Sequence, residues 1–146
     1  MYVIADQVPG YLHQSNGSIV AQNATGKECT SAYIPVKENE SIVIQSWCTP
    51  LNQDGTANPG YSWLAYQFFS DDDPVTPIGN RAAKWGYSSG SGVETSADGV
   101  EHLTYTVIAP TNAKYIRVSY RSYEDGYAMV EKADTPSEYI INPIDL

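Results

Sequence analysis

The sequence predicts an all-β domain in which two antiparallel sheets pack as a jelly-roll-like β-sandwich. Three observations support this fold class. The composition combines twelve Tyr, three Trp and nine Pro with a charged fraction of only 17%. Apolar and polar residues alternate over short segments that turn residues separate. No stretch longer than one or two turns shows the 3.6-residue period of a helix. At 146 residues, the chain is most simply one domain, 1–146.

The first half of the chain predicts short strands separated by turns. Residues 10–21 read as two short strands joined by an Asn-Gly turn. The polar segment 23–31 is expected to be a loop. An extended pair, Tyr33–Ile34, ends at Pro35, which marks a strand end or a sheet edge. A clear strand follows over residues 41–48.

The segment "WLAYQFF", residues 63–69, predicts a strand that is apolar on both faces. Residues 74–101 are rich in Gly and Ser and are expected to form a long loop, which in a compact domain is usually functional or mobile. Three further strands are expected within 101–110, 114–123 and 126–132. The last two are expected to form a hairpin that turns at residues 124–126, and an extended tail follows.

Alternation also predicts which side chains form the core, because residues two apart share one face of a strand. In "NAKYIRVSY", residues 112–120, Ile116 and Val118 fall on the face that reads as core. The predicted core consists of Ile42, Ile44, Leu64, Tyr66, Phe68, Val107, Ile116, Val118 and Val130.

The charge of the chain limits its partners. Seventeen acidic residues against eight basic ones give a formal net charge of −9. Nucleic acid and anionic membrane surfaces are therefore not expected as partners, because both are bound through clustered Lys and Arg. The sequence shows neither a run of about 18 apolar residues nor the pattern of a signal peptide.

Few residues suggest catalysis or metal binding. The sequence has no Gly-x-Ser-x-Gly elbow, phosphate-binding Gly-rich loop or zinc spacing, and no carboxylate stands in a recognisable catalytic context. We therefore expect no enzyme activity, no catalytic metal and no cofactor. The run Asp71–Asp73 has the oxygen ligands that calcium prefers, but it lacks a Gly-punctuated loop, so a solvated acidic turn is favoured over a structural calcium site. Cys29 and Cys48 could form a disulfide or remain as two packing cysteines.

Aromatic residues beside arginines carry the functional signal. Sugars have apolar C–H faces that stack on Trp and Tyr rings, and hydroxyl groups that hydrogen-bond to Arg and amide side chains. The outward faces of two strands and the segment 74–101 supply both kinds of group. The alternative for each ring is ordinary core packing. The candidate carbohydrate-binding residues are Trp63, Gln67, Arg81, Trp85, Tyr87, Tyr115, Arg117, Arg121 and Tyr123.

Four segments resemble a known family: "TSAYIPV" (30–36), "WLAYQFF" (63–69), "APTNAKYIRVSY" (109–120) and "AMVEKADTPSEY" (128–139). They are similar to recurrent segments of carbohydrate-binding modules in tail and baseplate proteins of siphophages that infect Gram-positive bacteria. The resemblance spans most of residues 10–140. It implies a jelly-roll-like sandwich that is located in the virion and binds saccharide of the host cell wall. It also implies other tail and baseplate proteins as partners. It does not transfer a defined set of binding residues.

Three functions therefore remain open at the level of sequence. The leading one is non-catalytic binding of a host cell-surface saccharide by a phage tail or baseplate protein. The second is a structural or assembly module of the tail that binds no ligand. The third is the accessory glycan-binding domain of a secreted polysaccharide-degrading enzyme. Trp side chains gathered in one groove would favour the first or third function, and uniformly buried aromatic residues would favour the second.

Overall fold

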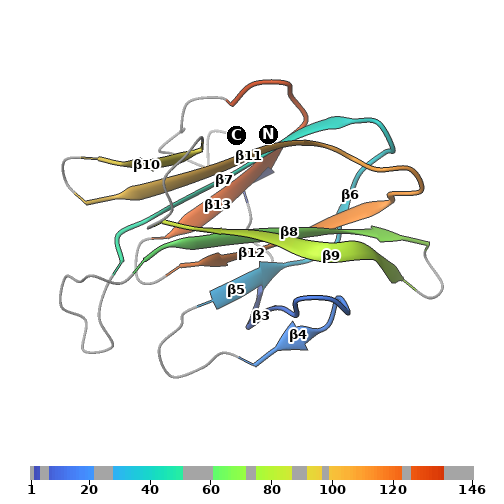
Figure 1. The fold of residues 1–146 in the computed structure, drawn as a ribbon, viewed down its shortest axis with the longest axis horizontal. Coiled ribbons are helices and arrows are strands. Elements are labelled where there is room, and N and C mark those ends of the chain that lie inside the picture. Colours follow the sequence, from blue (N-terminus) through green and yellow to red (C-terminus); the bar gives the residue numbers. More distant parts are fainter. Residues whose placement is uncertain are drawn as a thin grey trace.

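The computed structural model describes residues 2–3, 7–21, 28–50, 61–71, 75–86, 92–96, 99–122 and 126–136. Within these ranges the protein is all-β, and two antiparallel sheets pack face to face (Figure 1), which confirms the predicted sandwich. In the same part of the chain, no helix is long and apolar enough to cross a membrane.

The strands divide between two main sheets and one hairpin. The five-stranded sheet has the order β1 (Tyr2–Val3), β13 (Tyr127–Glu131), β7 (Ser41–Cys48), β11 (Glu101–Ile108), β10 (Val93–Thr95). The six-stranded sheet has the order β2 (Gln7–Pro9), β5 (Glu28–Ser31), β12 (Tyr115–Arg121), β8 (Trp63–Ser70), β9 (Thr76–Trp85), and β6 (Ile34–Pro35) also pairs with β12. A separate hairpin joins β3 (Tyr11–Leu12) to β4 (Ile19–Val20).

The core lies between the two main sheets and contains the nine residues that alternation predicted. Seven of them are buried, and Tyr66 and Val107 are partly buried and pack against the others. Ile116 of β12 and Phe68 of β8 lie opposite each other in the strand register. The prediction is confirmed because successive side chains of a strand point to opposite faces, so the order of residues determines which of them share a face.

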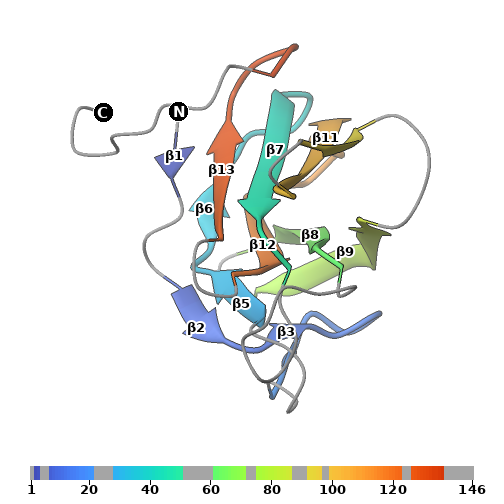
Figure 2. The ribbon, with the colours of Figure 1, turned by 90° about the vertical axis from the view of Figure 1, so that its left-hand side faces the viewer.

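The β3–β4 hairpin covers part of the outer face of the six-stranded sheet, the face turned away from the core (Figures 1 and 2). The backbone N–H of Leu12 donates to Ser119 Oγ at 3.0 Å, and Thr30 Oγ1 donates to the carbonyl of Gly10 at 2.8 Å. Leu12, Thr30 and Ser119 are all fully buried. The sheet is thus covered on both faces here, which explains why β8 carries apolar residues on both of its sides.

The predicted loop over 74–101 is wrong for most of its described residues. Strand β9 occupies ten of them and pairs with β8, and β10 adds a second, shorter strand. The register between β8 and β9 shifts opposite Gly79, whose φ of +66° is a conformation that glycine adopts without strain. Pro77, Gly79 and two adjacent alanines weaken the strand pattern, and pairing with the well-formed strand β8 compensates for it.

Two further expectations on connections are also wrong. β12 and β13 do not form a hairpin, because β12 belongs to the six-stranded sheet and β13 pairs with β7 in the other. Residues 28–31 form strand β5 instead of part of a loop. Cys29 and Cys48 therefore lie in different sheets, and both are free thiols. Alternation identifies strands, but it contains no information about which strands pair.

Burial of three tyrosines predicts a loss of stability at alkaline pH. Burial raises the pKa of Tyr66, Tyr105 and Tyr120 above the ordinary value of 10.0. The folded state therefore holds these phenols neutral at a pH where the unfolded chain ionises them. The contribution of these neutral, buried phenols to the free energy of unfolding is complete below pH 10.0 and is lost as the pH rises above that value. Urea midpoints measured from about pH 8 to 11 should fall at the alkaline end, and Tyr105→Phe should reduce the fall. An alkaline fall of equal size in Tyr105→Phe would contradict the assignment to Tyr105.

Candidate functional site

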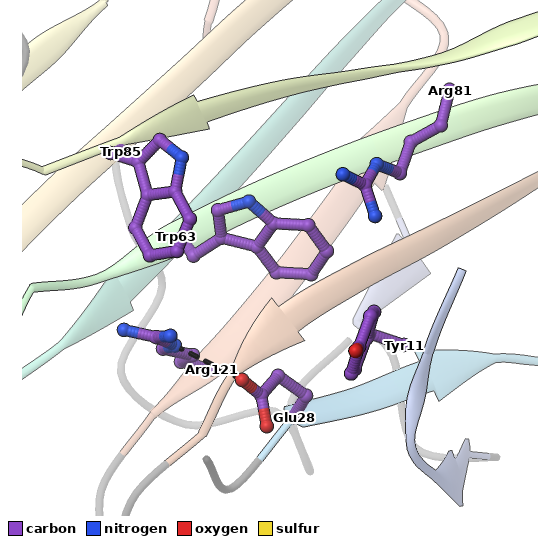
Figure 3. A pocket seen from close by; sticks show the side chains of 6 residues that line it. All are labelled: Tyr11, Glu28, Trp63, Arg81, Trp85 and Arg121. Atoms are coloured by element: carbon purple, nitrogen blue, oxygen red, sulfur yellow. Dashed lines mark hydrogen bonds and ion pairs between the residues drawn. The ribbon is translucent and has the colours of Figure 1, made fainter. Parts of the chain in front are cut away.

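A pocket of about 170 Å³ lies on the outer face of the six-stranded sheet, at the end where Trp63 begins β8 (Figure 3). Strands β5, β8, β9 and β12 and the hairpin strand β3 each contribute at least one side chain to it. Its lining residues are Tyr11, Glu28, Trp63, Arg81, Trp85 and Arg121.

Two indole rings form the centre of the pocket. Trp63 and Trp85 lie directly opposite each other in the β8–β9 register, and their ring centroids are 6.1 Å apart at an angle of 50°. Gly86 follows Trp85 at a position with no room for a side chain, because a Cβ there would lie 1.6 Å from Glu101 Oε2. The same carboxylate oxygen accepts hydrogen bonds from the N–H and the hydroxyl of Ser62, at 2.8 and 2.6 Å. Glu101, from the other sheet, therefore fixes the strand ends that carry both tryptophans.

Each indole has a guanidinium group beside it. Arg81 Cζ lies 5.0 Å from the centroid of the Trp63 ring, and Arg121 Cζ lies 4.7 Å from that of Trp85. Both are cation–π distances, at which the ring quadrupole attracts the cation. Between Arg81 and Trp85 on this face stands Ala83, opposite Ala65 on β8. Two small side chains at this point leave space for Arg81 to lie over Trp63.

Glu28 is the one acidic residue among those that line the pocket. It is 4% exposed, and its Oε1 accepts a hydrogen bond from Arg121 Nε at 3.3 Å. Arg121 also donates through Nη1 to the carbonyl of Tyr61 at 2.9 Å. Two guanidinium groups and one carboxylate give the pocket a positive formal charge, although the whole chain carries −9.

Tyr11 forms the wall that the hairpin contributes. Its ring meets Trp63 edge to face, with centroids 5.9 Å apart and an interplanar angle of 86°. Arg81 holds the hairpin in place, because its Nη1 donates to the carbonyl of Leu12 at 2.6 Å and its backbone N–H donates to that of Gln14 at 3.1 Å. The pocket therefore depends on the docking of β3 onto the sheet.

Three polar atoms at the pocket are buried and lack a hydrogen-bond partner. They are Trp63 Nε1, Arg81 Nε and Glu28 Oε2, three of the five such side-chain atoms in the part of the chain that the structure describes. A buried polar group without a partner typically costs about 1–3 kcal/mol, so such groups call for an explanation. These two donors and one acceptor belong to residues that line a pocket with two indoles, a combination that suits a polar ligand with an apolar face.

The structure brings together four of the nine residues that the sequence suggested. Trp63, Arg81, Trp85 and Arg121 meet in this pocket. Arg81 and Trp85 were expected in a loop and lie instead on strand β9. Trp63 was expected to face outward; it does point to the outer face, but it is only 4% exposed because Tyr11 and its neighbours surround it.

Tyr115 and Arg117 lie apart from the pocket, around Tyr33. The Tyr33 and Tyr115 rings are 5.8 Å apart, and Arg117 Cζ lies 4.4 Å from the Tyr33 centroid. Arg117 was expected on an open surface, but it is only 9% exposed, and its Nε donates to the carbonyl of Ser31 at 2.9 Å. The expectation was wrong because alternation cannot show that neighbouring segments cover the outer face.

Gln67 was also expected to be open to a ligand, and this is wrong as well. It is 1% exposed, and its Nε2 donates to the carbonyl of Gly79 at 2.7 Å. This bond lies at the register shift between β8 and β9, so the amide supports the irregular backbone there.

Tyr87 and Tyr123, the other two candidates, lie outside the described residues. The same holds for Asp72 and Asp73 of the acidic run considered for calcium. Within the described ranges, no group of three or more His, Cys, Asp or Glu side chains is arranged to hold a metal ion.

Sequence reasoning missed Tyr11 and Glu28. Tyr11 belongs to a two-residue strand, and Glu28 begins a strand within a segment expected to be a loop. Neither has a distinctive motif around it, because each reaches the pocket through pairing or docking with distant segments. The register that places Glu28 opposite Arg121 is the feature that brings the ion pair together.

Comparison of the chain with models of known protein families, with curated proteins and with solved structures finds no match.

Proposed function

We propose that this domain binds saccharide, without catalysis, through the pocket that Trp63 and Trp85 line. The observation that carries the proposal is that two indoles and two guanidinium groups line one small cavity, and that three of its lining residues each have a buried polar atom without a partner. Indole faces suit the C–H face of a pyranose, and the polar atoms suit its hydroxyl groups. At about 170 Å³ the pocket is smaller than a site for a drug-sized ligand, which favours one or two sugar units.

The biological setting that we propose is adhesion of a phage tail or baseplate to a Gram-positive host. Support for it comes from the resemblance of four sequence segments to modules of such proteins. An accessory domain of a secreted polysaccharide-degrading enzyme would use the same pocket chemistry. The sequence that adjoins this domain in its full-length protein would separate these two settings.

Cell binding tests the proposed function directly. Labelled domain should bind intact Gram-positive cells of a susceptible strain, and removal of their surface polysaccharide should abolish the binding. Trp85→Ala should weaken the binding about tenfold or more, since loss of one aromatic platform removes a large part of a small contact. Ile108→Ala is the matched control, because Ile108 is 66% exposed on the other sheet, and it should bind as the parent does.

A ligand-free structural module is the competing function. It predicts that the domain binds none of a panel of Gram-positive cells and wall polysaccharides, and that Trp85→Ala changes only the melting temperature. Equal binding by the parent and by a folded Trp85→Ala variant would instead place a saccharide site elsewhere on the domain.

A further inference from the structure

The two arginines of the pocket differ in how their charge is compensated. Arg121 pairs with the buried carboxylate of Glu28 at 3.3 Å. Arg81 has no carboxylate within ion-pairing distance among the described residues. The positive formal charge of the pocket therefore resides on Arg81.

The surroundings of Arg81 leave most of its hydrogen-bonding capacity unused. A guanidinium group has five N–H donors, and Nη1 of Arg81 donates to the carbonyl of Leu12. Its Nε is buried and has no partner. Burial lowers the pKa of Arg81, and the nearby Tyr11 and Tyr105 only partly oppose this effect. A guanidinium stays charged at neutral pH, so this is a cation that has lost part of its solvent without gaining an anion.

The ring that Arg81 covers belongs to a residue that carries a second unpartnered donor. The guanidinium end of Arg81 points toward the indole of Trp63, whose Nε1–H is buried and unpartnered (Figure 3). Both nitrogens are buried, so a ligand that enters the pocket would meet Arg81 through the remaining N–H groups of its guanidinium. A guanidinium without a carboxylate partner favours an anionic oxygen over a hydroxyl, because charge-assisted hydrogen bonds are about twice as strong as neutral ones.

We propose that the pocket selects a sugar residue bearing a negatively charged group, a carboxylate or a phosphate ester, which Arg81 binds. This proposal rests on the saccharide-binding function proposed above. The net charge of −9 opposes such a ligand only weakly, since exposed charges beyond about 8 Å are screened at physiological ionic strength.

Chemical removal of the acid groups tests the proposal with the unmodified protein. The probe is wall polysaccharide from a Gram-positive strain that the domain binds, used as isolated, after reduction of its carboxyl groups, and after removal of its phosphate esters with hydrogen fluoride. Binding measured by calorimetry should fall about tenfold or more in one of the two treated samples, which identifies the group. Equal binding to all three samples would overturn the proposal and leave saccharide binding intact. Failure to bind any saccharide would overturn both proposals.

A charge-removing variant gives a second and independent measurement. Arg81→Gln should weaken binding to the untreated polysaccharide about tenfold and should change binding to the sensitive, treated sample little. Arg81→Lys should retain more affinity than Arg81→Gln, because it keeps the charge. Lys114→Gln removes the same charge from an exposed position away from the pocket and should bind as the parent does. A variant Arg81→Gln that melts like the parent and binds the untreated polysaccharide equally well would overturn the proposal.

Discussion

Replacement of Ile116 by alanine should lower the free energy of unfolding by about 2–5 kcal/mol. Ile116 is fully buried in β12 and lies opposite Phe68 on one neighbouring strand and Ile34 on another. Its truncation removes apolar contacts and leaves a cavity between two sheets that cannot collapse freely. Urea unfolding followed by tryptophan fluorescence measures the change.

Two companion variants calibrate this result. Ile116→Val removes a single methylene and should cost about 0.5–1.5 kcal/mol. Ile108→Ala removes a similar side chain at a position that is 66% exposed and should cost no more than about 0.5 kcal/mol. A loss in Ile116→Ala as small as that in Ile108→Ala would show that β12 does not pack against the core as described.

Replacement of Arg121 by methionine should destabilise the fold by about 3–5 kcal/mol at neutral pH. Glu28 would then retain a charge in a site where it is 4% exposed and would lose the Arg121 Nε–H that contacts its Oε1. The Tyr61 carbonyl would also lose its donor from Arg121. Most of this cost is the penalty of an unpaired buried charge and not the net strength of the ion pair. Chemical denaturation of the purified variant measures the loss.

The double variant Arg121→Met/Glu28→Gln tests that explanation. It should recover a large part of the stability lost in Arg121→Met, since it removes the charge left without a partner. Lys132→Met breaks the exposed pair between Lys132 and Glu40, which is 3.5 Å long, and should cost less than about 1 kcal/mol. If Arg121→Met were as mild as Lys132→Met, the Glu28 site would be far better solvated than the structure indicates.

The candidate site could be predicted in part because residue chemistry is local. Trp63, Arg81, Trp85 and Arg121 were each suggested by an aromatic ring or a guanidinium near turn or strand signals. The β8–β9 register and the pairing of β12 with β8 bring these four side chains into one pocket. Tyr11 and Glu28 could not be predicted, because a docked hairpin and a pairing across more than ninety positions place them there.

Strand faces were determined by the sequence alone. Side chains in a strand alternate with a period of two, so Ile42 and Ile44, or Ile116 and Val118, had to share a face whatever their strands paired with. The same rule indicated an all-β sandwich and its core residues. Local alternation is a property of the backbone geometry of each strand, and no distant contact is needed to establish it.

Tertiary structure alone decided which strands pair and what covers the outer face. It assigned β12 and β13 to different sheets, made a strand of the Pro- and Gly-containing residues 76–85, and buried Gln67 and Arg117. These outcomes depend on contacts between segments far apart in the chain, such as the hydrogen bond from the Leu12 N–H to Ser119 Oγ. A period-two pattern states which residues share a face, but whether solvent, a hairpin or a ligand meets that face depends on segments elsewhere in the chain.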